Sequence, residues 1–275
     1  MKIIQPMPNS IFTITPAPEW PSIPFQTDAA GPHLWTWDIS WATYRKSGTV
    51  RTLSNQWDAK GVAANSGGTL TVRVQADNQA VIIAVKIKGT NPSLADVTHF
   101  LAVKPNSLGF DQILIHKSGC RNFLATGEPI KSFDNGYGIC PLTNPAPSFE
   151  QIWNWKLNVE GGLALFASKQ IEAINYLSQN NRSYTADQLA HETVCRWNGG
   201  TYYEWDEAAG KWIRHPYILC DPTTGNIGWD MNDPQNKGKT EAALHQRDSA
   251  SYGAPPSANA HWEYSGVCYA DKILG

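Results

Sequence analysis

The first clear hydrophobic pattern in the chain is a strict alternation between residues 34 and 41. Every second position carries a large apolar side chain, and the positions between them are polar: Trp35, Trp37, Ile39 and Trp41 against Thr36, Asp38 and Ser40. A period of two residues predicts a β-strand with one face buried. This strand is expected to bury an aromatic face.

Two further segments show the same period. Leu70, Val72 and Val74 form one face of the first, and Val81, Ile83, Val85 and Ile87 form one face of the second. Turn residues separate the segments at Ser47-Gly48, Ser66-Gly67-Gly68 and Asp77-Asn78, and the last segment ends at Gly89. Short strands at this spacing predict a small antiparallel β-sandwich in the immunoglobulin style.

The period changes after Pro92, and the signals that follow are helical. Ser93 with Asp96, and Thr185 with Gln188, have the spacing of capping boxes. An apolar stripe over 149–179 predicts a long helix, which Gly161-Gly162 would divide into two pieces. The second capping box begins a helix that should stop at Asn198-Gly199-Gly200. Residues 201–257 have no clear period, and a helix is expected over 261–274.

The sequence therefore predicts an α+β fold. Residues 1–32 are rich in proline and are expected to form an extended lead-in. Residues 33–92 would form the β-sandwich domain and residues 93–275 a mostly helical domain, with each of the two folding by itself.

Composition narrows the classes of partner. Charged residues make up only 17% of the chain and the formal net charge is −2, so no basic excess favours nucleic acid. No apolar run reaches the roughly 20 residues of a membrane span, and no membrane partner is expected. The start, MKIIQPMPNS, lacks the apolar core of a secretory leader, so a conventional signal peptide is not expected.

Aromatic and cysteine residues are the unusual part of the composition. The chain has 12 Trp, 10 Tyr and 8 Phe, and aromatic, charge-poor surfaces suit sugars, although most of these rings should lie in the core. The five Cys include no CxxC pair, so a structural zinc site is not expected. We expect free buried thiols, with one disulfide as the alternative.

The segment that carries chemistry is 113–145, ILIHKSGCRNFLATGEPIKSFDNGYGICPLTNP. It resembles the goose-type lysozyme and lytic transglycosylase family, in which a helix ends in a catalytic Glu followed by Ser and a G-[FYA]-G-[LI]-M-Q segment comes later. Residues 135–140, NGYGIC, match that second motif. Residues 153–162, 196–200 and 264–274 resemble three further blocks of the family, in the same order.

The resemblance implies a lysozyme-like domain with a small β-lobe, directed at the β-1,4 bonds of peptidoglycan glycan strands, with no cofactor and no metal. It implies that the glycan is bound by a set of residues from the matching blocks: Ser118, Tyr137, Gly138, Pro141, Trp197 and Asn198. These residues would line one cleft between the end of the first helix, the lobe and the 196–200 turn.

Two positions depart from the family pattern. Lys117 stands where the family has its catalytic Glu, and Pro141 stands where it has Gln. An ammonium group with a pKa of about 10.4 cannot cycle between acid and base near neutral pH. Its charge would also oppose a developing oxocarbenium ion by about 4 kcal/mol at 4 Å and an effective dielectric constant of 20. The catalytic activity of the site is therefore expected to be weak or absent.

Other carboxylates are candidates to replace the missing catalytic Glu. Asp134 precedes the NGYG motif and is the best candidate for an auxiliary acid, although a turn role is the simpler interpretation. We expect Glu128, in the loop between the motifs, to be a solvated charge. Glu192 and Arg196 are spaced as a surface pair on a helix.

The resemblance extends to biological setting. Chains with a β-domain before a muramidase-like domain resemble the C-terminal parts of antibacterial effectors of type VI secretion. Such a protein would be made in a bacterial cytoplasm and act in the periplasm of a target cell, with an immunity protein and secretion-apparatus domains as partners. The alternatives are a phage tail lysin and a non-catalytic module that binds peptidoglycan for a partner hydrolase.

Overall fold

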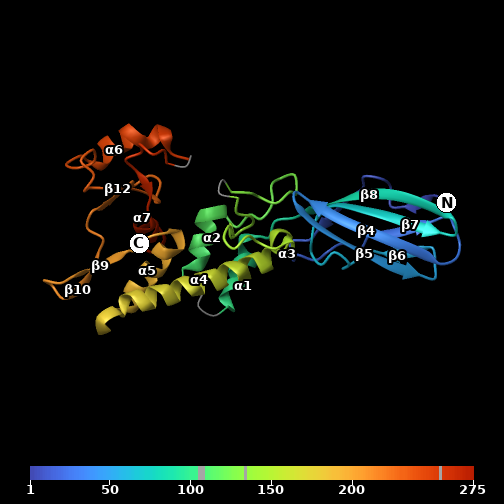
Figure 1. The fold of residues 1–275 in the computed structure, drawn as a ribbon, viewed down its shortest axis with the longest axis horizontal. Helices are drawn as coiled ribbons and strands as arrows, with labels where there is room; N and C mark the ends of the chain where they lie inside the picture. Colours follow the sequence, from blue (N-terminus) through green and yellow to red (C-terminus); the bar gives the residue numbers. More distant parts are fainter. Residues whose placement is uncertain (105–108, 133–134, 254–255) are drawn as a thin grey trace. The chain divides into compact units, whose positions relative to one another are not determined.

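The computed structural model describes residues 1–104, 109–132, 135–253 and 256–275 (Figure 1). The chain combines α-helices and β-sheets, as the sequence predicted. It divides into two compact units. The first comprises Met1–Pro105 and Leu114–Gly162, and the second comprises Asn106–Ile113 and Leu163–Gly275.

The main sheet of the first unit contains the strands that the alternating pattern predicted. Its strand order is β2 (Ile11–Ile14), β8 (Gln79–Gly89), β7 (Gly68–Ala76), β4 (His33–Trp41) and β5 (Tyr44–Thr52). All pairs are antiparallel except β2 with β8, which is parallel. Trp35 and Ile39 are fully buried, so the aromatic face lies inward as expected.

One turn lies elsewhere than predicted. Ser47-Gly48 is not a turn, because β5 runs through both residues and pairs Gly48 with Trp37 of β4. The chain reverses instead at residues 42–43, where Ala42 adopts a φ of 50°. Neither residue there is a typical turn residue, so sequence reading had no signal at that position.

Residues 1–32, expected to be an extended lead-in, contribute to the sheets. β1 (Ile3–Gln5) and β3 (Pro24–Thr27) join β6 (Gln56–Asp58) in a second sheet, and β2 extends the first. Four side chains from this stretch lie in the core: Ile14, Trp20, Ile23 and Phe25. Prolines separate these short strands, so none of them is long enough to show a period.

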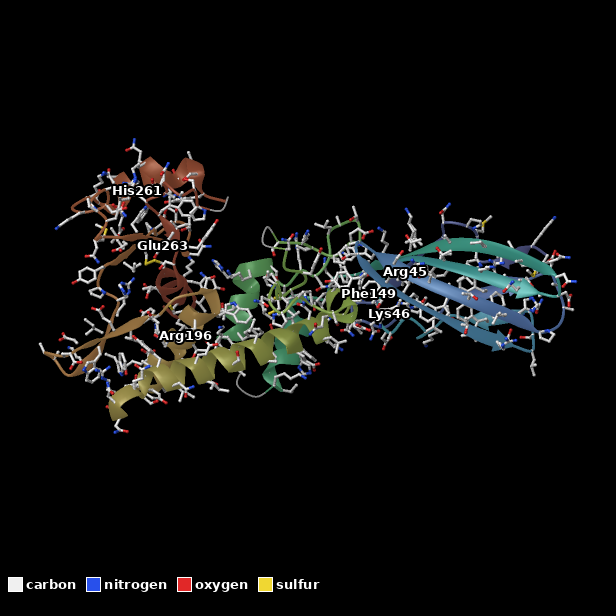
Figure 2. The ribbon with its side chains drawn as sticks, in the orientation of Figure 1. Arg45, Lys46, Phe149, Arg196, His261 and Glu263 are labelled. Atoms are coloured by element: carbon white, nitrogen blue, oxygen red, sulfur yellow. A yellow bond between two sulfur atoms is a disulfide. The ribbon has the colours of Figure 1, made fainter. Side chains whose placement is uncertain are left out.

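The apolar core of the first unit continues past residue 92, where the sequence suggested a boundary. Trp57 of β6 packs against Trp35 of β4 with ring centroids 5.7 Å apart, which brings side chains of the two sheets together. The same cluster also includes Phe123, Phe149, Ile152 and Trp153 from beyond the sheets. Tyr44 of β5 stacks on Phe149, and Lys46 pairs with Glu150 (Figure 2). A fragment that begins at residue 93 would lose the apolar partners of these residues.

Helices follow the sheets along the chain, and the sequence predicted some of their ends. α1 (Leu94–Ala102) begins at Ser93, whose hydroxyl accepts the amide of Asp96, as predicted. α3 (Phe149–Trp153) precedes α4 (Trp155–Leu177), and the division between them falls at Asn154 rather than at Gly161-Gly162. The Asn154 side chain accepts the amide of Lys156 at 3.0 Å and so caps the new helix. α2 (Phe110–Ser118) carries the Lys117 motif.

The second unit contains the predicted α5 (Ala186–Asn198), which begins at Thr185 and ends at Gly199. The stretch expected to be irregular forms β9 (Tyr203–Asp206), β10 (Lys211–Arg214), β11 (Ile218–Cys220), β12 (Ile227–Asp230) and α6 (Glu241–Asp248). β13 (Glu263–Tyr264) then leads into α7 (Gly266–Leu274). Single 3₁₀ turns lie at Gln179–Asn181 and Ser249–Ser251.

The cysteines follow both expectations in part. Cys220 and Cys268 form a disulfide, which was the alternative, and Cys120, Cys140 and Cys195 are free and buried. Among the helices that the structure describes, none has the length and apolarity needed to cross a membrane.

Gly67 and Trp153 give a direct test of the first unit's core. A Cβ at position 67 would lie 2.2 Å from the Trp153 ring, so Gly67→Ala should destabilise the protein by about 1–3 kcal/mol through overpacking. Trp153→Leu should also destabilise it, because it empties part of the core. In the double variant the smaller Leu leaves room for the Ala, so the combined loss should be clearly smaller than the sum. Urea unfolding of all four proteins measures this, and strict additivity would contradict the contact.

Candidate functional site

Lys117 and Ser118 are the last two residues of α2. Lys117 is exposed in the last turn, where its positive charge suits the helix dipole. The Ser118 hydroxyl donates to the carbonyl of Leu114 at 3.1 Å. Gly119 and Cys120 then adopt positive φ angles and turn the chain away from the helix. A side chain at 117 therefore sits on a rigid element just before a sharp reversal.

The described residues between Cys120 and Leu142 (120–132 and 135–142), called the lobe below, form a small irregular β-structure. Isolated bridges join Phe123 to Pro129 and place Tyr137 between Lys131 and Leu142. Tyr137 is half-buried, and its ring meets the edge of Trp41 at 5.4 Å between centroids. The lobe is therefore packed against the end of β4, and the Trp41 ring holds the Tyr137 ring in place on one side.

The centre of the NGYGIC motif is held by one buried side chain of α4. Asn158 donates to the carbonyl of Tyr137 at 2.9 Å and accepts the amide of Cys140 at 2.7 Å. Gly138 lies between them with a φ of 94°, and a Cβ there would lie 2.4 Å from the Asn158 amide nitrogen. Only glycine satisfies both the backbone angle and the lack of space. This contact joins two sequence blocks that lie 20 residues apart.

Two more asparagines hold the start of the lobe. The Asn122 side chain accepts the amide of Ile139 at 3.2 Å and donates to the carbonyl of Ile152 at 3.0 Å. Asn91 accepts the amides of Asn122 and Phe123, both at 2.8 Å. Because Asn122 and Asn158 are fully buried, each of these bonds replaces water that the buried backbone cannot reach. Amide side chains therefore hold the backbone in this part of the lobe.

Pro141 is half-buried and adjoins this network. Its carbonyl lies close to Gly136, where an added Cβ would approach it to 2.6 Å. The residue has no N–H to donate and no polar side chain. The lobe therefore forms with a proline at this position.

Of the two carboxylates near the lobe motif, the structure describes only Glu128. Asp134 lies outside the described residues. Glu128 is not a solvated charge: it is half-buried, it pairs with Lys88, and it accepts the indole N–H of Trp41 at 2.5 Å. Sequence reading missed this because Lys88 and Trp41 belong to strands far away in the chain.

Trp197 and Asn198 belong to the second unit, whereas Lys117, Ser118, Tyr137, Gly138 and Pro141 belong to the first. The Trp197 ring meets Phe110 at 5.5 Å and Phe166 at 5.9 Å, both edge-on, so packing fixes much of its surface. Asn198 is the last residue of α5, before Gly199 with a φ of 94°. Within the first unit, the structure brings Tyr137, Gly138 and Pro141 together in the lobe.

The position of Glu192 differs from the prediction. It was expected on the surface, but it is fully buried, and its pair with Arg196 at 2.8 Å is largely shielded from solvent. Its second oxygen accepts the amides of Tyr202 and Tyr203 at 2.8 and 3.1 Å. The carboxylate therefore ties the chain after α5 back to the helix, a structural role that the i,i+4 spacing alone did not reveal.

Sequence reading also missed a hollow in the second unit. It has a volume of about 350 Å³ and is lined by residues of the α5–β9 loop, β11, β13 and the start of α7. Its polar side chains are those of Thr201, His215, Glu263, Tyr264 and Ser265. Partial burial and the nearby Asp230 raise the pKa of Glu263, and His215 opposes this shift. No sequence motif surrounds Glu263, so no signal marked it.

A third group of polar side chains surrounds Asp221. The buried carboxylate accepts bonds from His245 at 2.7 Å, from Tyr252 at 2.9 Å and from the Thr223 hydroxyl at 2.6 Å. Burial by itself would raise the pKa of Asp221, but these hydrogen bonds lower it to about 2. The group links the β11–β12 turn to α6 and the segment after it.

No protein-family model matches this sequence, and no curated protein matches it. Within the described ranges, no set of three or more His, Cys, Asp or Glu side chains is grouped closely enough to hold a metal ion. The geometry of the lobe is therefore the main basis for assigning a function.

Asp221 gives a prediction for the acid stability of the second unit. Its folded-state pKa of about 2 lies below the reference value of 3.8, so its contribution of about 2 kcal/mol is present above pH 4 and is lost as the pH falls through 2. Asp221→Asn should lower stability at pH 7 by about that amount and flatten the pH dependence between 4 and 2. Asp77→Asn, at an exposed turn, is the control. Thermal unfolding across this range checks it, and an unchanged acid limb would contradict it.

Proposed function

We propose that this chain carries a lysozyme-like domain that binds the glycan strands of peptidoglycan and cleaves them weakly or not at all. The observation that carries the proposal is the Gly138–Asn158 contact. The NGYGIC motif and the Asn of the 153–162 block were each identified by resemblance, and these two segments meet through a buried amide and a glycine with no room for a side chain.

The lobe also has the chemistry that a sugar site needs. Tyr137 offers an aromatic ring that is half-exposed and fixed by Trp41, and carbohydrate C–H faces pack against such rings. The backbone around it is rigid because Asn91, Asn122 and Asn158 hold it. A rigid site loses less conformational entropy when a flexible glycan binds.

The weak or absent cleavage in this proposal follows from Lys117. General acid catalysis contributes about 10²–10⁴-fold, and glycoside cleavage needs a carboxylic acid with a raised pKa at the leaving oxygen. An exposed lysine in the last turn of α2 supplies neither an acid of suitable pKa nor a negative charge. At this position its positive charge instead stabilises α2, since cations stabilise helix C-termini by about 0.3–1 kcal/mol.

The same observation favours a second candidate, a non-catalytic peptidoglycan-binding module. A positive charge at position 117 would be compatible with binding an anionic polymer and incompatible with the usual cleavage chemistry. The two candidates share the glycan site and differ only in turnover. Retention on peptidoglycan without cleavage would favour the module.

The wider setting belongs to the same proposal. We assign the two sheets of the first unit to an immunoglobulin-like β-sandwich and the rest of the chain to the lysozyme-like part. The protein would act on the wall in the periplasm of a target bacterium, as part of an antibacterial type VI secretion effector with an immunity partner. A phage tail lysin would use the same site.

Restoring the missing groups tests the proposal. Lys117→Glu should give measurable cleavage of purified peptidoglycan, because it supplies a proton donor and removes a cation from the reaction site. Adding Pro141→Gln should increase it further, because an amide and a backbone N–H return to the lobe. Dye release from labelled peptidoglycan measures the wild type, both single variants and the double variant.

Lys117→Gln is the matched control, since it removes the charge without supplying an acid and should stay inactive. Lys117→Glu should cost up to about 1 kcal/mol of stability through the helix dipole, so each variant is first checked by thermal unfolding. A folded double variant that binds peptidoglycan without cleaving it would exclude the enzyme and leave the binding module. A folded double variant that neither binds nor cleaves would contradict both candidates.

A further inference from the structure

A second hollow, in the first unit, lies at the end of the main sheet beside the lobe. Its volume is about 250 Å³, and its lining comes from three strands and the loop residue Glu128. The lining residues are Ser40, Trp41, Ala42, Gly68, Thr69, Lys86, Lys88 and Glu128. No sequence motif marks this place, because its lining residues are spread over positions 40–128 of the chain.

The strand register arranges the polar groups of this hollow in a row. Ser40 of β4 pairs with Thr69 of β7, and Thr69 pairs with Lys86 of β8. Directly paired residues project to the same side of a sheet, and Lys86 alternates with the buried Val85 and Ile87. Two hydroxyls and an ammonium group therefore lie side by side on the face away from the core.

The charges in the hollow do not balance. Lys88 and the indole N–H of Trp41 both engage Glu128, so that carboxylate is already compensated. Lys86 is exposed, and no ion pair to it is found among the described residues. The hollow thus carries one positive charge in excess, beside two hydroxyls that can donate. A carboxylate is the group that this combination suits best.

The hollow and the lobe are neighbours. Trp41 lines the hollow and also contacts the ring of Tyr137, and Glu128 belongs to the lobe itself. A glycan held at Tyr137 would therefore present its side branches within a few residues' reach of Lys86, since an extended peptide spans about 3.3 Å per residue. In peptidoglycan those branches are short peptides that carry free carboxylates.

We infer that the hollow formed by Ser40, Thr69, Lys86 and Trp41 binds a carboxylate of the peptide stem of peptidoglycan. The inference rests on the proposed function for its choice of peptide. The small volume accommodates the end of a peptide and not a run of sugar rings. The β-structure would then be part of the recognition surface, reading the peptide while the lobe holds the glycan.

The test uses the whole protein and the soluble stem tetrapeptide, titrated by calorimetry. The peptide should bind, and the same peptide with its carboxylates amidated should bind at least 10-fold more weakly. Lys86→Glu should reduce the affinity at least 10-fold, and higher salt should weaken binding to the wild type, because the attraction is between exposed charges. Arg73→Glu, on the same face of β7 but outside the hollow, makes the same charge change and should leave the affinity within about twofold.

A tetrapeptide that does not bind, or a Lys86→Glu variant that binds it normally, overturns the inference. Equal losses in Lys86→Glu and Arg73→Glu also overturn it, because they would reflect net charge alone. Pelleting with glycan strands stripped of peptide separates the two proposals. Retention of the protein on bare glycan without peptide binding would refute the hollow and leave the proposed function standing, whereas peptide binding without glycan retention would do the reverse.

Discussion

The ring of Trp153 fills the space that a side chain at position 67 would occupy, and much of the first unit depends on that contact. The same ring meets Trp41 of β4 at 5.6 Å and Phe123 of the lobe at 5.7 Å. One fully buried indole therefore joins the sheet, the lobe and the helix that leads into α4. The strands and the lobe form a single packed body for this reason, and the lobe's position is set by the sheet.

The second constraint is polar. Backbone hydrogen bonds join parts of the lobe to one another, and the side chains of Asn91, Asn122 and Asn158 bond to further backbone groups in it. Such a site is shaped by backbone and amides, so it does not depend on the side chains at 117 and 141. This explains in physical terms how a lysine and a proline can stand at those positions while the lobe keeps its form.

Part of this could be read from the sequence. The strands with a clean period, the capping boxes at Ser93 and Thr185 and the end of α5 were predicted because local chemistry determines them. The strands before residue 32 and between 201 and 230 were missed because they are only a few residues long. The sequence predicts the break in the long helix at Gly161-Gly162. The structure has it at Asn154, because the side chain of Asn154 caps the start of α4. Burial of Glu192 and compensation of Glu128 depend on partners distant in the chain, which no local pattern reports.

Backbone NMR with a soluble, peptide-free glycan fragment of peptidoglycan tests the central claim most directly. If the glycan binds at the lobe, the amide signals of Tyr137, Gly138 and Ile139 should shift and reach saturation. These shifts should be lost in an Asn158→Ala variant that keeps the rest of the fold. Saturable binding whose shifts lie away from residues 135–142, or no binding at millimolar concentrations of the fragment, would contradict it.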